Sequence, residues 1–220
     1  MNPLAIISVE GAGGQKLAEL LSKNKKIKYF GNIYSRKAKG EWYEWIKTQV
    51  YQDSDIHYKK DRLDLQSAFM TTLFLRTDVV NKSIPLVYID HMDLDEYHEV
   101  LDLFKMGKFR VIHFRRHNLV NVMGNNSENP IIINIQDTIR KLMLIEKQQE
   151  LLKKELLSRD IQVLDVTYEE YESMWGRIAD FLELEKIHYK LWKESDNHDK
   201  IKNWDDFKKA LQYTQFAHMI

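Results

Sequence analysis

The sequence predicts an α/β fold of three layers, in which helices cover both faces of a central parallel sheet. Short β-branched runs alternate with segments of helical periodicity, a pattern typical of parallel strands joined by crossover helices. The length of 220 residues and the 44% hydrophobic content allow one well-packed core. We therefore expect a single domain over residues 1–220, with a helical insertion at about 36–84 and a helical C-terminal extension at about 170–220.

Strands are predicted where short runs are apolar and rich in β-branched or aromatic residues. They cover residues 5–9, 27–30, 86–89, 110–114 and 162–166. Helices are predicted where apolar residues recur every three or four positions, over 16–23, over about 97–104 and over 137–158. Residues 36–84 combine many aromatic and charged side chains, and we expect helices there that cover the carboxyl edge of the sheet, where α/β proteins bind ligands.

Composition excludes several classes of protein. The formal net charge of zero argues against nucleic-acid binding by bulk electrostatics, which usually requires a basic excess. The absence of cysteine removes disulfides, thiolate nucleophiles and cysteine zinc sites, and we expect no metal. The N-terminal apolar run is too short for a signal sequence, and no apolar stretch is long enough to span a membrane. We expect a soluble, cytoplasmic protein with no membrane span.

The first predicted strand runs into a glycine turn, Gly11-Ala12-Gly13-Gly14-Gln15-Lys16. Backbone amides of glycines can approach an anion closely, and the helix that follows adds unpaired N–H groups and the positive end of its dipole. The side chain of Lys16 adds a full charge. The turn is not a Walker A loop, since leucine follows Lys16, and it lacks the third glycine of a Rossmann fingerprint. A tight turn without a ligand is the alternative.

Two arginines, Arg115 and Arg116, follow the fourth predicted strand. The planar guanidinium group suits phosphate, and two neighbouring groups can bind a dianion between them. Ion pairs with Glu169 or Glu170, or plain solvation, are the alternatives. His91 follows the third predicted strand and is a candidate general base, or else a structural hydrogen-bonding residue. His113 lies inside the fourth strand and is expected in the core.

Several segments resemble sulfotransferases that use 3′-phosphoadenosine 5′-phosphosulfate, PAPS, and most closely the bacterial and nodulation-type branch. Residues 111–124 resemble the family's strand, arginine and helix that bind the 3′-phosphate. Residues 163–171 resemble the strand that ends in a Tyr-Glu-Asp-Leu-like motif, and residues 177–184 the helix after it. Residues 201–207 resemble the C-terminal Ile-x-Asn-Tyr-x-Glu-Leu, and residues 31–35 stand where this branch often has Gly-Glu-Pro-Phe-Asn.

The resemblance implies a P-loop NTPase-like sheet with strand order 2-3-1-4-5, and transfer of a sulfuryl group from PAPS to a hydroxyl or amine of a small-molecule or glycan acceptor. It implies that the residues from Gly11 to Lys16 bind the 5′-phosphosulfate, that Arg116 binds the 3′-phosphate and that Tyr168 lies by the adenine. Gly124 stands where the family has a serine for the 3′-phosphate. His91 falls near the position of the family's base histidine, and Lys16 would offset charge on the bridging oxygen.

The chain also departs from the family pattern. Its turn between Gly11 and Gln15 has no side-chain hydroxyl, and Asn32 stands where one branch has a glutamate base. Each missing hydrogen bond is worth roughly 1 to 3 kcal/mol. Two alternatives to an active sulfotransferase therefore stay open. One is a sulfotransferase-like binding module without activity, and the other is a Rossmann-type enzyme that uses a nucleotide or a nucleotide sugar.

Overall fold

The computed structural model describes residues 2–9, 11–33, 69–70, 83–91, 99–119, 130–185, 189 and 200–219. Its centre is a five-stranded, all-parallel sheet with strand order β2-β3-β1-β4-β5. The strands are β1 (Leu4–Ser8), β2 (Ile27–Asn32), β3 (Ile84–Asp90), β4 (Arg110–Arg115) and β5 (Gln162–Thr167). The predicted α/β class and the strand order are both confirmed.

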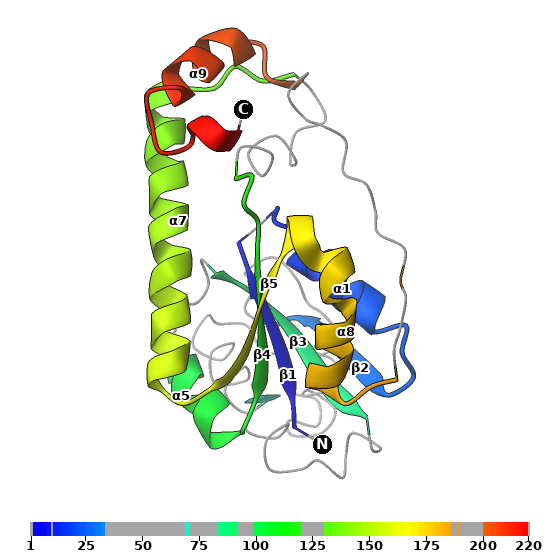
Figure 1. Ribbon diagram of the computed structural model, residues 1–220. Coiled ribbons are helices and arrows are strands. Elements are labelled where there is room, and N and C mark those ends of the chain that lie inside the picture. Colours follow the sequence, from blue (N-terminus) through cyan, green and yellow to red (C-terminus); the bar gives the residue numbers. More distant parts are fainter. Residues whose placement is uncertain are drawn as a thin grey trace, which may run out of the picture.

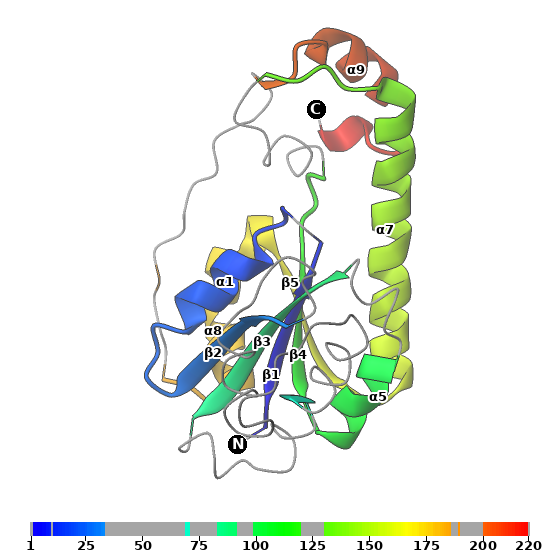
Figure 2. The ribbon, with the colours of Figure 1, turned by 180° about the vertical axis from the view of Figure 1, so that it is seen from behind.

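Helices cover both faces of this sheet (Figures 1 and 2). On one face lie α1 (Gly14–Leu21) and α8 (Tyr171–Leu182), and on the other lie α5 (Glu99–Met106) and the long α7 (Ile135–Ser158). The short helices are η2 (Tyr168–Glu170), α9 (Trp204–Leu211) and η4 (Ala217–Met219). Within the described part of the chain, no helix is both long and apolar enough to cross a membrane.

The strands have two buried faces, and each face carries its own apolar cluster. Leu4 and Ile6 of β1 pack against Leu17 of α1 and Ile178 of α8. The alternate residues of the same strand belong to the cluster on the α5 and α7 side, with Ala5, Ile7, Phe104, Leu152 and Leu156 among its members. Because successive strand residues point to opposite faces, a strand buried on both sides is mostly apolar, as β1 is from Leu4 to Ile7.

A third apolar cluster lies beyond the carboxyl edge of the sheet. Leu142 in the N-terminal half of α7 packs there with Phe207 and Leu211 of α9 and with Phe216. Figure 1 shows α7 extending past the sheet to reach α9 and the C-terminal end of the chain. The side chain of Asn203 joins this C-terminal segment to the start of α7, because it both donates to Ile133 O (2.8 Å) and accepts from Ile133 N (3.0 Å).

The order of the strands creates a topological switch point between β1 and β4. The chain leaves β1 through α1 toward β2 on one side, and it leaves β4 through α7 toward β5 on the other. In open parallel sheets, ligands bind in the crevice where neighbouring strands connect in opposite directions. The order also differs from the Rossmann order, in which β2 lies directly beside β1. The Rossmann alternative therefore does not fit this sheet.

Helix boundaries differ by about two residues from those predicted. Helix α1 begins at Gly14 rather than at residue 16, because Gly13 in a left-handed conformation (φ 98°) is its N-cap. Helix α7 begins at Ile135 rather than at residue 137, because the side chain of Asn134 accepts a hydrogen bond from Asp137 N (3.2 Å). Most of the predicted insertion at 36–84 lies outside the described residues. Phe69 and Met70 are described there, and both are buried in the cluster on the α5 and α7 side.

Gly14 allows the start of α1 to lie directly against the sheet. A Cβ at this position would stand 2.3 Å from Ser8 Oγ and 3.1 Å from Tyr88 Cε2. The same two side chains are joined by a hydrogen bond between Ser8 Oγ and Tyr88 Oη (3.2 Å). The absence of a side chain at Gly14 therefore fixes how closely the helix N-terminus approaches β1 and β3.

We expect Gly14→Ala to lower the free energy of unfolding by about 1–3 kcal/mol, because the added methyl group overpacks the contact with Ser8. Gly176→Ala is the matched control: Gly176 is exposed on α8, and a Cβ there meets nothing within 4 Å. Since glycine disfavours a helix interior, this control should stabilise the protein by about 0.5–1 kcal/mol. Urea unfolding followed by circular dichroism measures both changes. If Gly14→Ala leaves the free energy of unfolding unchanged, the packing role of Gly14 is wrong.

Candidate functional site

The candidate site lies at the carboxyl ends of β1 and β4, on either side of the switch point. Ile7 of β1 and His113 of β4 are the last registered pair of these neighbouring strands. Gly11 comes four residues after Ile7, and Arg116 comes three residues after His113. The fold therefore brings the two predicted anion-binding segments to the same edge of adjacent strands.

Two glycines shape the turn between β1 and α1. Gly11 has φ 81° and Gly13 has φ 98°, a region that other residues rarely adopt. The amide of Ala12 donates to Val9 O (3.0 Å) and closes a β-turn in which Gly11 is the third residue. Ala12 is one of the residues predicted to bind the cofactor, and its amide is already used within the turn.

The N-terminus of α1 supplies the remaining anion-binding chemistry of this segment. Its first helical hydrogen bond runs from Leu17 N to Gly13 O (3.0 Å), so the earlier amides, those of Gly14 and Gln15 among them, point out of the helix end. The side chain of Gln15 donates to Glu19 Oε1 (3.2 Å), along the helix rather than toward the turn. Lys16 is exposed in the first turn. This end of α1 attracts negative charge.

Arg116 lies on an aromatic ring at the same edge of the sheet. Its guanidinium carbon is 4.6 Å from the centre of the Tyr168 ring, and the residue is only 5% exposed. Tyr168 follows β5 and meets Phe114 of β4 edge to face (6.4 Å between ring centres). Tyr168 packs against the apolar cluster on the α1 and α8 face of the sheet. Arg116, which lies on its ring, is therefore on the side of the sheet that carries α1. The ring supports a guanidinium group without neutralising its charge.

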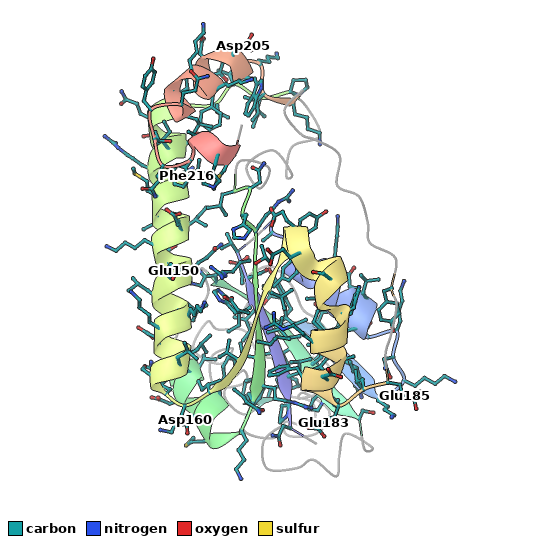
Figure 3. The ribbon with its side chains drawn as sticks, in the orientation of Figure 1. Glu150, Asp160, Glu183, Glu185, Asp205 and Phe216 are labelled. Atoms are coloured by element: carbon teal, nitrogen blue, oxygen red, sulfur yellow. The ribbon has the colours of Figure 1, made fainter. Side chains whose placement is uncertain are left out.

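Arg115 has a different environment, because consecutive strand residues point to opposite faces of the sheet. Its Nε donates to one oxygen of Asp165 (2.9 Å), and its Nη2 donates to the other. Its Nη1 donates to Glu150 of α7 (3.1 Å). Figure 3 labels Glu150 midway along α7. The predicted pair of arginines on one dianion is not what the structure forms, since Arg115 is held by two carboxylates.

Asp165 of β5 is the centre of this charged cluster. His113 Nδ1 lies 3.1 Å from Asp165 Oδ1, and Lys153 of α7 donates to Asp165 Oδ2 (2.8 Å). Burial alone would raise the pKa of Asp165, but the close approach of His113 and the hydrogen bonds from Lys153 and Arg115 outweigh burial and hold this pKa well below its usual range. The carboxylate is therefore ionised at neutral pH and ties α7 to β4 and β5. His113 is buried as predicted, with Asp165 as its polar partner.

Glu169 organises the chain just after β4. Its two carboxylate oxygens accept from the backbone amides of His117 (3.0 Å) and Asn118 (2.9 Å). The side chain of Asn118 in turn donates to Met219 O (3.3 Å) in the C-terminal segment. We considered Glu169 as a salt-bridge partner of the arginines, but these contacts direct its carboxylate to the backbone. Glu169 thus fixes the turn that carries Arg116.

Of the other predicted site residues, His91 directly follows β3 and is 3% exposed. Its neighbour Asp90 is registered with Ser8 of β1, so His91 lies at the same sheet edge as the glycine turn. Gly124 lies outside the described residues. Within the described ranges, no three acidic or histidine side chains are grouped to hold a metal ion.

Three residues of this charged cluster were not predicted as site residues: Asp165, Glu150 and Lys153. One signal was available, because Asp165 interrupts the apolar run of residues 163–166 in a predicted strand. A carboxylate in such a strand requires a partner. The partners from α7 had no local signal, because their side chains look like the other charged residues of a long amphipathic helix.

Comparisons with known proteins do not assign the chain to a family. No family model matches the sequence, and no curated protein matches it. A solved structure from work on the PezAT chromosomal toxin-antitoxin system of Streptococcus pneumoniae aligns over 97% of this chain and 88% of its own, with 12% sequence identity and a TM-score of 0.36. A likeness of this strength carries no argument. The description of the fold therefore depends on the strand order and register.

We expect Asp165→Asn to lower the free energy of unfolding at pH 7 by about 2–3 kcal/mol, because hydrogen bonds to a charged group are lost. The pKa of Asp165 is lowered in the folded protein, so its stabilisation is complete above the unfolded pKa of about 4 and is lost as pH falls toward the folded pKa. The difference between wild type and variant should therefore shrink from pH 5 to pH 2.

Urea unfolding at several pH values measures this difference. Asp180→Asn is the control, since Asp180 is an exposed aspartate on α8, and this variant should differ little from wild type throughout. A difference between wild type and Asp165→Asn that stays constant down to pH 2 would show that the cluster does not lower the pKa of Asp165.

Proposed function

We propose that the protein binds a nucleotide with phosphate groups at two positions, and that it is a sulfotransferase that takes its sulfuryl group from PAPS. The observation that carries the proposal is the position of Arg116. Its buried guanidinium group lies on Tyr168 at the carboxyl end of β4, beside the strand that leads into the glycine turn. The resemblance of residues 111–124 and 163–171 to the family supplies the identity of the nucleotide.

The residues present fit such a ligand in three respects. Arg116, buried against the Tyr168 ring, has a planar guanidinium fork that suits one phosphate group. Tyr168 supplies an aromatic surface of the kind on which a base can stack. The N-terminus of α1, with the amides of Gly14 and Gln15 and the charge of Lys16, suits a second anionic group on the neighbouring strand. These contacts use the backbone and two cations, and they need no hydroxyl group in the turn.

When bound, PAPS supplies an activated sulfuryl group on its 5′-phosphate. The residues of this chain would then position and stabilise the reacting groups. Lys16 and the end of α1 would offset negative charge that develops on the bridging oxygen, and His91 would accept the proton of the attacking hydroxyl or amine. In such a transfer His91 would hold the proton of the acceptor, and Lys16 would stabilise the 5′-phosphate that is released with the bisphosphate product.

A non-enzymatic binding module is the second candidate. Two contacts favour it: Glu169 already occupies the amides of His117 and Asn118, and Ala12 donates within its own turn. Both contacts reduce the number of donors that remain for phosphate. This module would bind the nucleotide, or a related anion, without transferring a group.

Titration calorimetry with adenosine 3′,5′-bisphosphate and adenosine 5′-monophosphate tests the site. Wild type should prefer the bisphosphate, because only this ligand has a phosphate group for Arg116. Arg116→Ala should weaken binding of the bisphosphate by about 10- to 100-fold, the range for a lost charge-assisted hydrogen bond. This variant should then bind the two nucleotides with equal affinity. The comparison of two ligands separates the loss of one contact from a general loss of folding.

Arg140→Ala is the matched control, because Arg140 is an exposed arginine on α7 that pairs only distantly with Asp137 (3.8 Å). It should leave both affinities unchanged. Arg116→Lys keeps the charge without the planar fork, so its affinity for the bisphosphate should lie between those of wild type and Arg116→Ala. If wild type binds neither nucleotide, or if Arg116→Ala still prefers the bisphosphate, the proposed site is wrong.

A turnover assay distinguishes an enzyme from a binding module. With PAPS and a panel of phenols, amines and sugars, an enzyme releases the bisphosphate product, and His91→Asn should lower kcat by roughly 100-fold or more because the base is lost. The bisphosphate affinity of His91→Asn should stay within about twofold of wild type. Nucleotide binding without turnover on any acceptor of the panel would favour the module.

A further inference from the structure

A separate pocket lies at the opposite edge of the sheet, where the strands begin. Its volume is about 170 Å³. It is lined by Lys26, Ile84, Arg110, Leu182, Glu183 and Leu184. Ile84 and Arg110 are the first residues of β3 and β4, Lys26 directly precedes β2, and the others end α8. Figure 3 labels Glu183 at the end of the molecule away from Asp205 and Phe216.

Arg110 is the unusual residue of this pocket, because its guanidinium group is buried and few groups nearby compensate its positive charge. The residue is 4% exposed. Its Nη1 donates to Phe181 O at the end of α8 (2.8 Å) and to Glu183 Oε1 (3.1 Å). Its Nε is buried and has no hydrogen-bond partner among the described residues. Burial lowers the pKa of Arg110, and the nearby charge of Glu183 opposes this effect.

Glu183 is a weak partner for a buried cation. Its side chain is 86% exposed, so water screens its charge and competes for its oxygens. A buried charge normally has a partner that is buried with it, because desolvation is otherwise unfavourable. The carbonyl of Phe181 at the end of α8 compensates the charge of Arg110 only in part. An anion inside the pocket would be a better partner than the exposed glutamate.

The walls of the pocket restrict what this anion can be. Ile84, Leu182 and Leu184 line the pocket with apolar atoms, but each is almost fully buried, so only a compact apolar group can lie against them. Arg110 and the exposed Lys26 offer two cations to a single acidic group. The negative end of the α8 dipole lies beside them and disfavours a second negative charge. A monoanion therefore fits better than phosphate or sulfate.

We propose that this pocket binds a small organic monoanion, a carboxylate on a compact apolar body, which pairs with Arg110 and Lys26 and displaces the carboxylate of Glu183. The site is independent of the proposed nucleotide site, since one lies at the amino ends of the strands and the other at the carboxyl ends. Such a ligand acts as an effector that stabilises the fold between β3, β4 and α8.

Benzoate is the probe, since its ring and single carboxylate match this chemistry. Titration into the ¹⁵N-labelled full chain, followed by two-dimensional NMR, should give saturable shifts in residues 182–184 and at Lys26. Glu183→Gln should bind benzoate roughly three- to fivefold more tightly, because the competing charge is removed while an acceptor for Arg110 remains. Lys26→Gln should bind more weakly. Benzamide, the neutral analogue, should not bind.

Matched variants separate the pocket from general surface charge. Glu185→Gln and Lys25→Gln make the same charge changes at neighbouring exposed positions that do not line the pocket, and neither should alter the affinity. If benzoate gives no saturable shifts up to 50 mM, or if Glu183→Gln and Glu185→Gln change its affinity equally, the proposal is overturned. Neither result depends on nucleotide binding, so failure here is distinguishable from failure of the proposed sulfotransferase.

Discussion

The carboxylate of Asp165 determines how the charges at the carboxyl edge are distributed. It accepts hydrogen bonds from Arg115 and Lys153 and lies against His113, and so it connects β5 to β4 and to α7. Without this acceptor, Arg115 would lose the carboxylate that binds two of its guanidinium nitrogens. With it, Arg115 belongs to the contact between the sheet and α7, whereas Arg116 lies on the Tyr168 ring. A single carboxylate thus separates a structural arginine from a candidate ligand-binding one.

Strand β4 begins with Arg110 and ends with Arg115, and Arg116 directly follows it. The three arginines differ in the groups that face them. Arg110 meets an exposed glutamate and the end of α8. Arg115 meets a half-buried aspartate that belongs to a larger cluster. Arg116 meets an aromatic ring. Arg115 is therefore neutralised within the fold, whereas the only carboxylate that faces Arg110 in the described part of the chain, that of Glu183, is exposed to water.

The sequence was sufficient for the α/β class and for all five strands, because each strand contains a short run rich in β-branched or aromatic residues between polar or glycine-containing segments. The strand order came only from the resemblance to a family, since local patterns do not encode which strands are neighbours. The pairing of Asp165 with Arg115 and Lys153 could not be predicted, because it joins β5 to residues of two other elements. The role of Gly14 in packing was likewise hidden, since a glycine required by a neighbouring serine looks the same as one that faces a ligand.

The glycines of the turn after β1 have two roles, and together these account for a proposed anion site in a turn without hydroxyl groups. Gly11 and Gly13 give the turn its left-handed conformations, and Gly14 brings the end of α1 against Ser8 and Tyr88. The position of the helix end is therefore fixed by packing rather than by the ligand. A site of this kind is organised before binding, so that less ordering free energy opposes the ligand. In the proposed nucleotide site, the cations Lys16 and Arg116 would have to supply the binding strength that a turn without hydroxyl groups lacks, and nucleotide binding should weaken as salt screens the exposed Lys16.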